Sequence, residues 1–123
     1  MSGDWMLNYK LIVTIVMKGT AKKIVAASKK AGSEGGTTIL GRGTGIHEMQ
    51  KLFGICIDPE KEIILTLIDS SKLDKVLSAI VEAGQLNKPG YGIAFVLPTK
   101  HIAGIAHLLK SLTRGVSDDG SVV

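Results

Sequence analysis

The residue types best suited to chemistry in this sequence are glycines with a few cations beside them, which together favour anion binding. The segment Gly41–His47 contains Arg42, Gly43, Thr44 and Gly45. Glycine lets backbone N–H groups come close to an anion, and an arginine adds a charged donor. The segment matches neither a Walker loop nor a dinucleotide-binding motif, because no strand-to-helix turn of the required spacing follows. It is therefore either a candidate phosphate-binding element or an ordinary turn at the end of a strand.

A second glycine-rich segment runs from Gly84 to Gly92 and includes Lys88, Gly90 and Tyr91. By itself it predicts a connector that contains a Pro-Gly turn. If the fold or a subunit boundary brings it beside the first segment, two loops rich in backbone amides would form a phosphate cradle. In such a cradle the glycines offer backbone contacts, and Arg42 or Lys88 supplies positive charge.

Metal binding and catalysis are not predicted by the remaining polar residues. Their spacing matches no common set of metal ligands, because two of the histidines are six residues apart and the cysteine stands alone. The sequence shows no paired carboxylates, no nucleophile elbow and no Cys-His signature, so we expect no enzyme. The residues considered are His47, Cys56, Asp58, His101 and His107.

An internal repeat defines the elements that must position these segments. A shift of 52 residues aligns Leu11–Gly32 with Ile63–Gly84 without a gap. Each copy begins with a continuous apolar stretch that predicts a buried strand, and an amphipathic helical pattern follows. We expect Gly32 and Gly84 to end these helices in a left-handed cap. A second strand closes each copy, over residues 37–41 and 92–97.

The order β-α-β-β-α-β predicts an α+β domain with the ferredoxin-like fold and a four-stranded antiparallel sheet. Right-handed connections place both helices on one face of that sheet. The strands are apolar on both sides, so the other face needs a cover, and a homo-oligomer provides one.

Composition limits the possible functions further. The 123 residues, 45% of them hydrophobic, suit one domain with a thin core. The net charge of +4 is spread along the chain without interleaved aromatic residues, which argues against nucleic-acid binding. The apolar stretch Leu11–Met17 is too short to span a bilayer. A single cysteine and no visible secretion signal make the cytoplasm the expected compartment.

The order and spacing of several short motifs resemble the PII signal-transduction family over about residues 9–100. These motifs follow the first predicted helix, enter the next strand, open the long loop and surround the second connector. The resemblance implies a homotrimer that holds ATP or ADP between subunits, with Thr37, Gly43, Gly45, Gly90 and Gly92 at nucleotide-contact positions. The motifs are Ala31-Gly32, Gly35-Gly36-Thr37-Thr38, Gly43-Thr44-Gly45, Ala83-Gly84, Gly90-Tyr91-Gly92 and Phe95-Val96.

Departures from the family pattern bear on the ligand. Tyr91 stands where the family has Asp, Ile93 where it has Lys, and His47 where it has Gln, and the family's pair of Arg residues after the last strand is absent. Because each missing charged donor removes a strong contact, ADP or AMP becomes as plausible a ligand as ATP. The His47 replacement also puts 2-oxoglutarate binding in doubt.

The resemblance further implies a regulated partner protein, with a membrane transporter as the best candidate, that contacts the long loop Thr44–Glu60. This loop has no Tyr or Ser that could be modified. We expect a PII-like domain over residues 1–113 and a flexible tail over residues 114–123. The alternatives are a trimeric ferredoxin-like structural or metal-tolerance protein without a nucleotide and, third, a small enzyme with this fold.

Overall fold

The elements follow the predicted order, with an additional short strand pair between the two halves. The computed structural model describes residues 8–44, 50–52, 55–57 and 59–104, so Gly45, His47 and the tail predicted at residues 114–123 lie outside the described residues. The elements are β1 (Tyr9–Met17), α1 (Ala21–Ala31), β2 (Thr37–Arg42), β3 (Gln50–Leu52), β4 (Ile55–Ile57), β5 (Glu60–Asp69), α2 (Leu73–Gly84) and β6 (Gly92–Pro98).

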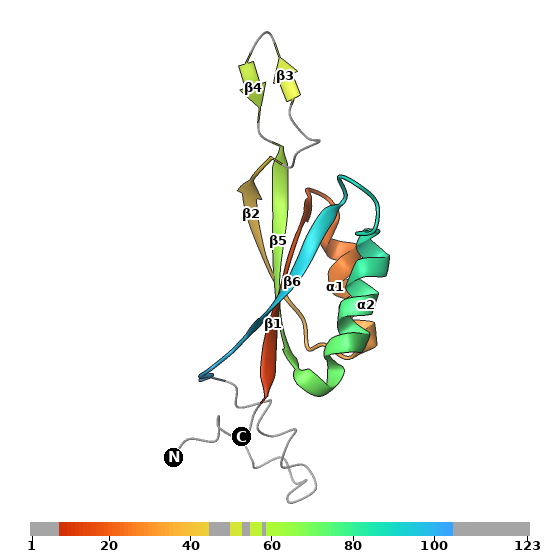
Figure 1. Cartoon of the computed structure of the whole chain (residues 1–123), viewed down its shortest axis with the longest axis vertical. Helices are drawn as coiled ribbons and strands as arrows, with labels where there is room; N and C mark the ends of the chain where they lie inside the picture. Colours follow the sequence, from red (N-terminus) through yellow and green to blue (C-terminus); the bar gives the residue numbers. More distant parts are fainter. Residues whose placement is uncertain (1–7, 45–49, 53–54, 58, 105–123) are drawn as a thin grey trace, which may run out of the picture. The chain divides into compact units, whose positions relative to one another are not determined.

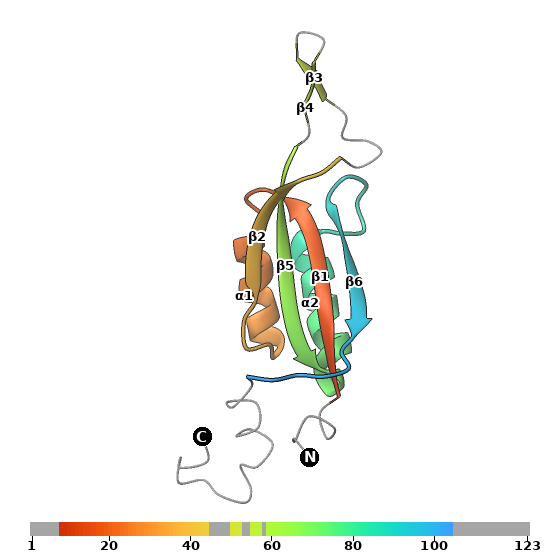
Figure 2. The same cartoon turned by 90° about the vertical axis from the view of Figure 1, so that its left-hand side faces the viewer.

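A four-stranded antiparallel sheet in the order β2-β5-β1-β6 forms the centre of the fold. Strand β1 pairs with β5 from Tyr9↔Asp69 to Met17↔Lys61 and with β6 from Lys10↔Pro98 to Val16↔Gly92. Both helices cover the same face of the sheet, as the two side views show (Figures 1 and 2). The predicted ferredoxin-like α+β fold is therefore confirmed.

A carboxylate accepts backbone N–H groups close to the start of each helix. At α1 the carboxylate comes from the sheet, since Glu62 Oε1 accepts hydrogen bonds from Gly19 N (2.8 Å) and Ala21 N (2.9 Å). At α2, Asp69 accepts from Ser71 N (2.8 Å) and starts a 3₁₀ turn that leads into the helix. A negative charge at a helix N-terminus is favourable because the first N–H groups have no partner within the helix.

The two helices end with the same hydrogen-bond pattern, but in the second copy of the repeat this pattern lies one residue later than in the first. After α1, Gly32 N donates to Lys29 O and Ser33 N to Ser28 O. After α2 the equivalent donors are Gln85 N, to Glu82 O, and Leu86 N, to Val81 O. Both pairs are Schellman motifs. The expectation of a left-handed cap at Gly84 is wrong, because α2 is one residue longer and Gln85, at φ 52°, takes that position.

The two faces of the sheet differ in burial. On the face toward the helices, Ile12, Val16, Ile64 and Ile68 are buried and form the core together with helix residues such as Ile24. Because side chains alternate along a strand, the neighbouring positions point to the other face. They are apolar too, and several are well exposed. This open face carries Leu11, Val13, Ile15, Ile39, Ile63, Leu65, Leu67, Ile93, Phe95 and Leu97.

Outside the sheet, the segment between Arg42 and Glu60 contains a two-stranded antiparallel ladder of its own, with Gln50↔Ile57 and Leu52↔Ile55 as its outer pairs. Residues Tyr9–Pro98 form one compact unit, and residues 99–104 have no regular secondary structure. No helix in the described ranges is both long and apolar enough to cross a membrane.

Two threonines at matching positions of the repeat are buried in this core. Thr14 and Thr66 are 0% and 1% exposed, and both hydroxyl groups lack a hydrogen-bond partner among the described residues. A buried hydroxyl without a partner loses its hydrogen bonds to water and gains none in the protein, which costs about 1–3 kcal/mol. The two threonines are therefore a source of instability inside the apolar layer.

We expect the substitution Thr66→Val to stabilise the protein by about 1–2 kcal/mol, because a methyl group replaces the unpaired hydroxyl at nearly the same shape. Thermal unfolding at a fixed protein concentration measures the effect. The exposed Thr38→Val is the matched control and should change stability by less than about 0.5 kcal/mol. A Thr66→Val variant that is less stable than the parent would show that the hydroxyl has a favourable interaction.

Candidate functional site

Both glycine-rich segments lie at one end of the sheet. Arg42, the last residue of β2, pairs with Glu60, and Gly92, the first residue of β6, pairs with Val16. Strands β2 and β6 are the outer strands, however, with β5 and β1 between them. Three strand spacings amount to roughly 14 Å, which is more than one phosphate group can bridge. A single protomer therefore does not join the two segments into one phosphate cradle.

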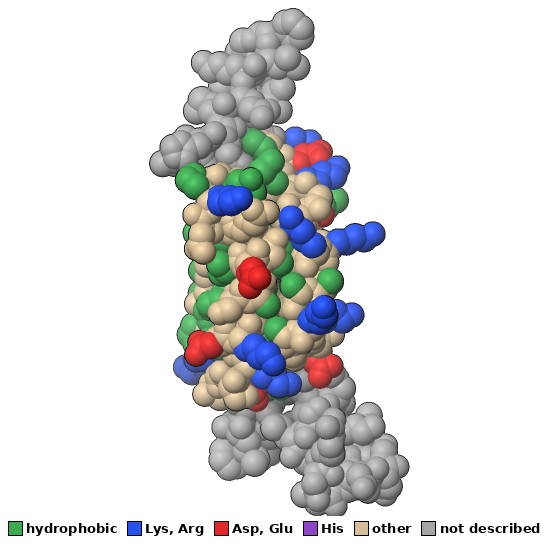
Figure 3. Space-filling view, turned by 90° about the vertical axis from the view of Figure 1, so that its right-hand side faces the viewer, with side chains coloured by type: hydrophobic (Ala, Val, Ile, Leu, Met, Phe, Trp, Pro, Cys, Tyr) green, Lys and Arg blue, Asp and Glu red, His purple; other side chains and the backbone are tan. Residues whose placement is uncertain are grey.

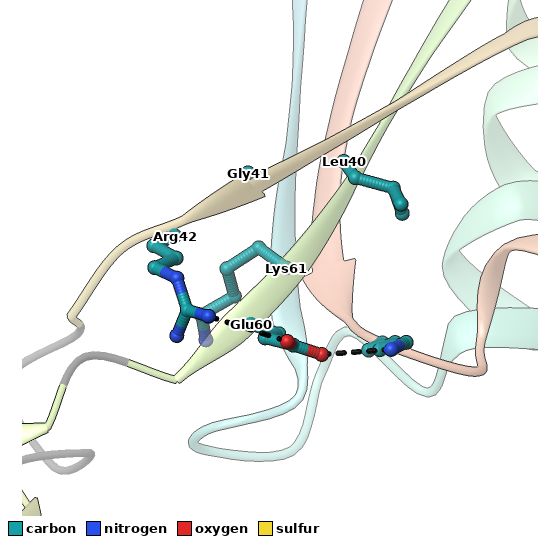
Figure 4. Close-up of a pocket in the computed structure, with 6 residues that line it drawn as sticks. Leu40, Gly41, Arg42, Glu60 and Lys61 are labelled. Carbon is teal, nitrogen blue, oxygen red and sulfur yellow. Dashed lines mark hydrogen bonds and ion pairs between the residues drawn. The ribbon is translucent and has the colours of Figure 1, made fainter.

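The first segment borders a cavity of about 250 Å³ at the end of the sheet (Figure 4). Glu60 binds two cations there: Lys18 Nζ lies 2.8 Å from Glu60 Oε2, and Arg42 Nη2 lies 3.4 Å from Glu60 Oε1. The three side chains come from the end of β2, the start of β5 and the turn after β1. The cavity is lined by Lys18, Leu40, Gly41, Arg42, Glu60 and Lys61.

This ion cluster changes the acidity of its members. The hydrogen bond from Lys18, followed by its charge, holds the pKa of Glu60 below the usual glutamate value, and Arg42 adds to the effect. The same contact raises the pKa of Lys18. Because the folded pKa of Glu60 is lowered, its contribution to stability is present above the usual glutamate pKa and is lost as the pH falls through the folded value. At neutral pH Glu60 is therefore ionised and Lys18 is protonated.

Backbone hydrogen bonds hold the same strand ends together. Gly43 N donates to Pro59 O (3.2 Å), and Lys18 N donates to Glu60 O (3.3 Å). A Cβ added at Gly43, which is half-buried, would make only an ordinary contact with Lys61 Cγ at 3.9 Å. The two hydrogen bonds thus fix the direction in which the first segment leaves the sheet.

The second segment contains the predicted Pro-Gly turn. Tyr91 N donates to Lys88 O (3.3 Å), Pro89 follows Lys88, and Gly90 has φ +81°, which together define a type II turn. Lys88 Nζ lies 5.5 Å from the centre of the Tyr91 ring, within the range of a cation–π contact. Tyr91 stands where the family has an Asp. Its ring therefore contacts Lys88, the one lysine of this connector.

Two of the glycines considered for binding have a packing reason in the structure. A Cβ at Gly92 would lie 2.5 Å from the carbonyl oxygen of Ile15, at a φ of +145°. A Cβ at Gly84 would lie 3.0 Å from Ile24 Cδ1 on the facing helix. Their contact with a nucleotide stays a prediction. Close packing against backbone already requires glycine at Gly92, whereas at Gly84 a Cβ would meet only the ends of flexible side chains.

Thr37 lies apart from the other predicted site residues. It is the first residue of β2, whereas Arg42 is the last, and five residues of strand amount to roughly 16 Å. Thr44 is exposed directly after the strand end. Sequence reasoning missed Lys18 and Glu60. The alternating charges of Glu60, Lys61 and Glu62 were a signal in the sequence that this strand end is charged. No local pattern, however, identifies Lys18 and Arg42 as the partners of Glu60.

The described part of the chain contains no group of three or more His, Cys, Asp or Glu residues that could hold a metal ion. At the sheet end, Glu60 pairs with Lys18 and Arg42, and the charge of Glu62 also acts on Lys18.

The arrangement of strands and helices defines a ferredoxin-like α+β domain, and comparison with known proteins narrows this class. The model of the nitrogen regulatory protein P-II family matches residues 9–107, so the chain belongs to this family. Proteins of the family are signalling regulators that bind small-molecule effectors and regulate partner proteins. The predicted family is therefore confirmed.

Solved structures support the same fold. The crystal structure of Arabidopsis thaliana PII bound to citrate matches with a TM-score of 0.61 and 21% identity over 79% of this chain and 80% of that one. A Bacillus cereus protein related to NIF3 matches with a TM-score of 0.60 and 22% identity over 77% of this chain but only 26% of that chain. A search of curated protein sequences finds no match.

We expect Gly92→Ala to lower the free energy of unfolding by about 2–4 kcal/mol, because the new methyl group collides with the Ile15 carbonyl and the backbone is strained at positive φ. Gly90→Ala is the matched control: its φ is also positive, but nothing lies within 4 Å of the added atom. It should cost only about 1 kcal/mol. Equal losses in denaturant unfolding at one protein concentration would contradict the packing role of Gly92.

Proposed function

We propose that this chain is a PII-like signalling protein that binds an adenine nucleotide between subunits and regulates a partner protein through the loop Thr44–Glu60. The observation that supports this proposal is the position of the two glycine segments. They lie at the same end of the sheet but on its two outer strands, so a neighbouring subunit is needed to complete one phosphate site. We propose the cytoplasm as its location and a membrane transporter as the regulated partner, and we propose no enzymatic activity.

The open face of the sheet supports a homotrimer. Ile93 and Phe95 of β6 and Ile39 of β2 are 55%, 41% and 45% exposed in the single chain, and they border a continuous apolar row across β1 and β5. An apolar surface of this kind is unfavourable in water and is normally covered by another molecule. Closed symmetry lets identical copies cover it without further growth.

We expect light scattering after size-exclusion chromatography to give three times the chain mass at micromolar concentration. The substitution Ile93→Asp should break the assembly, because it places a charge on the apolar face that the other subunits would cover. Leu40→Asp is the control, since Leu40 is 68% exposed and its register places it on the opposite side of β2. A monomeric parent protein would contradict the trimer.

The basic residues that the structure describes do not favour nucleic acid as the ligand. Lys and Arg side chains are scattered over the helix-covered side with acidic ones among them (Figure 3). A nucleic-acid surface would show a continuous basic stripe. The cations at the sheet end are few and close together, which suits the compact charge of a nucleotide's phosphates.

We expect calorimetry to detect binding of at least one of ATP, ADP and AMP to the full chain. Lys88→Gln should weaken this binding about three- to tenfold, because it removes a charged donor from the second glycine segment. Gly90 is unsuited to such a test, since its φ of +81° makes any side chain a strain on the backbone.

Lys30→Gln is the matched control, because Lys30 is an exposed lysine of α1 outside both glycine segments. It changes the net charge equally and should leave binding unchanged. Failure of all three nucleotides to bind the parent protein would overturn the nucleotide proposal. Thermal stabilisation by a divalent metal, without any effect of nucleotide, would instead favour the metal-tolerance alternative.

A further inference from the structure

The outward side of α1 carries a group of lysines, which we name the lysine patch. Of the exposed residues of this helix all but one are lysines, and the helix contains no acidic residue. Within the described part of the chain, none of these ammonium groups has an ion pair or a hydrogen bond. The lysine patch consists of Lys22, Lys23, Lys29 and Lys30, and the remaining exposed residue is Ala26.

Helical geometry gathers these lysines on one face. Lys22 and Lys29 are seven residues apart, so they lie on the same side of the helix, two turns and roughly 10 Å from each other. Lys23 and Lys30 form a second pair with the same spacing. Ala26 lies between the two pairs, and the opposite side of the helix packs on the core. The positive charges therefore form a compact patch around one small side chain.

The second copy of the repeat shows that the scaffold does not need this charge. At the positions of α2 that correspond to Lys22 and Lys30, the sequence has Asp74 and Glu82. Lysines in the first turn of a helix are also unfavourable by themselves, because that end already carries partial positive charge. Glu62 offsets this charge through its backbone contacts at the start of α1. A local preference that is violated without a gain in packing points to function.

Acidic groups border the lysine patch without pairing with it. Glu82 lines the same hollow between α1 and α2 as Lys30, and Glu62 lines another hollow with Lys22. Neither carboxylate has an ion pair with these lysines among the described contacts. In the space-filling view of the helix-covered side, several Lys and Arg side chains project from the surface (Figure 3). The ammonium groups are therefore accessible to a negatively charged partner.

The composition of the patch favours a lipid surface as that partner. Protein interfaces are centred on aromatic, arginine or large apolar side chains and are depleted in lysine. Among the described residues, the exposed large apolar side chains belong to strands and connecting segments, and none belongs to α1 or α2. Lysine, a point charge on a flexible stem, suits a surface whose charges are many and not fixed in position. The patch also lacks the length and the aromatic residues of a nucleic-acid surface.

We propose that the lysine patch docks the protein on an anionic lipid bilayer without inserting into it. The apolar side of α1 is already packed on the sheet, so the contact is electrostatic and depends on salt. Both helices lie on the sheet face opposite the open apolar one (Figures 1 and 2), so the patch stays accessible when other subunits cover that open face. The proposal goes beyond nucleotide binding and holds whether or not a nucleotide binds.

The test is sedimentation of the full chain with vesicles of phosphatidylcholine that contain about 30% phosphatidylserine, at about 0.1 M salt. We expect binding to these vesicles and none to vesicles of phosphatidylcholine alone. About 0.5 M salt should release the protein, because it shortens the range of the charges. Equal binding to both kinds of vesicle, or binding that salt does not weaken, would overturn the proposal.

Lys23→Gln and Lys75→Gln are a matched pair, because both lysines are exposed and occupy equivalent positions of the repeat. Lys23→Gln should weaken vesicle binding about fivefold, the contribution of one lysine close to an anionic surface. Lys75→Gln should weaken it less than about twofold, because Lys75 lies on α2 beside Asp74. The double variant Lys22→Gln with Lys29→Gln should weaken it about 20- to 30-fold. Equal effects of the matched pair would show that only net charge matters, which contradicts the proposal.

A footprint on the unmodified protein covers the case of a variant that does not fold. Acetic anhydride labels exposed lysines, and mass spectrometry measures the label at each one. Vesicles with phosphatidylserine should lower the labelling of the lysine patch and leave that of Lys75 nearly unchanged. Undiminished labelling of the patch would contradict docking. Protection by poly-glutamate or duplex DNA, with none by vesicles, would overturn the lipid assignment in favour of an acidic protein or a nucleic acid.

Discussion

The pairing of β1 with β5 is the constraint on which the rest of the structure depends. Its register, from Tyr9↔Asp69 to Met17↔Lys61, decides which side chains face the helices and which face outward. A shift of one residue would exchange the two faces along the whole strand. Because both strands are apolar on both faces, the pairing buries one apolar layer under the helices and leaves a second one open. That open layer is the reason for expecting association.

Carboxylates stand at several points of this fold where an anion is favourable. Glu62 accepts the N–H groups of Gly19 and of Ala21, the first residue of α1, Asp69 begins the turn into α2, and Glu60 lies between two cations at the strand ends. The first two complete helix ends and are parts of the scaffold. Glu60 differs because its side chain and those of its partners Lys18 and Arg42 are about half-exposed to water, so these pairs contribute little to stability.

The glycines also fall into two groups: those that close packing constrains and those where an added side chain would meet little. Gly92 approaches the Ile15 carbonyl so closely that no other residue fits, and Gly84 lets the two helices pack. Gly90 is required only by its turn and a Cβ there would meet nothing within 4 Å, whereas a Cβ at Gly43 would make an ordinary contact with Lys61 Cγ. A ligand can come close to the backbone most easily at a glycine with open space, such as Gly90. Motif spacing alone treats all four alike.

The sequence by itself determined the repeat, the order of elements, the ferredoxin-like fold and the turn at Pro89, because periodicity and turn residues act between neighbours along the chain. It missed the one-residue difference at the end of α2, where Gln85 and not Gly84 is left-handed. Only the tertiary structure brought Arg42 and Lys18 to Glu60 and separated Thr37 from them. Such contacts follow from strand register, which packing against the helices decides and which no local pattern of residues records.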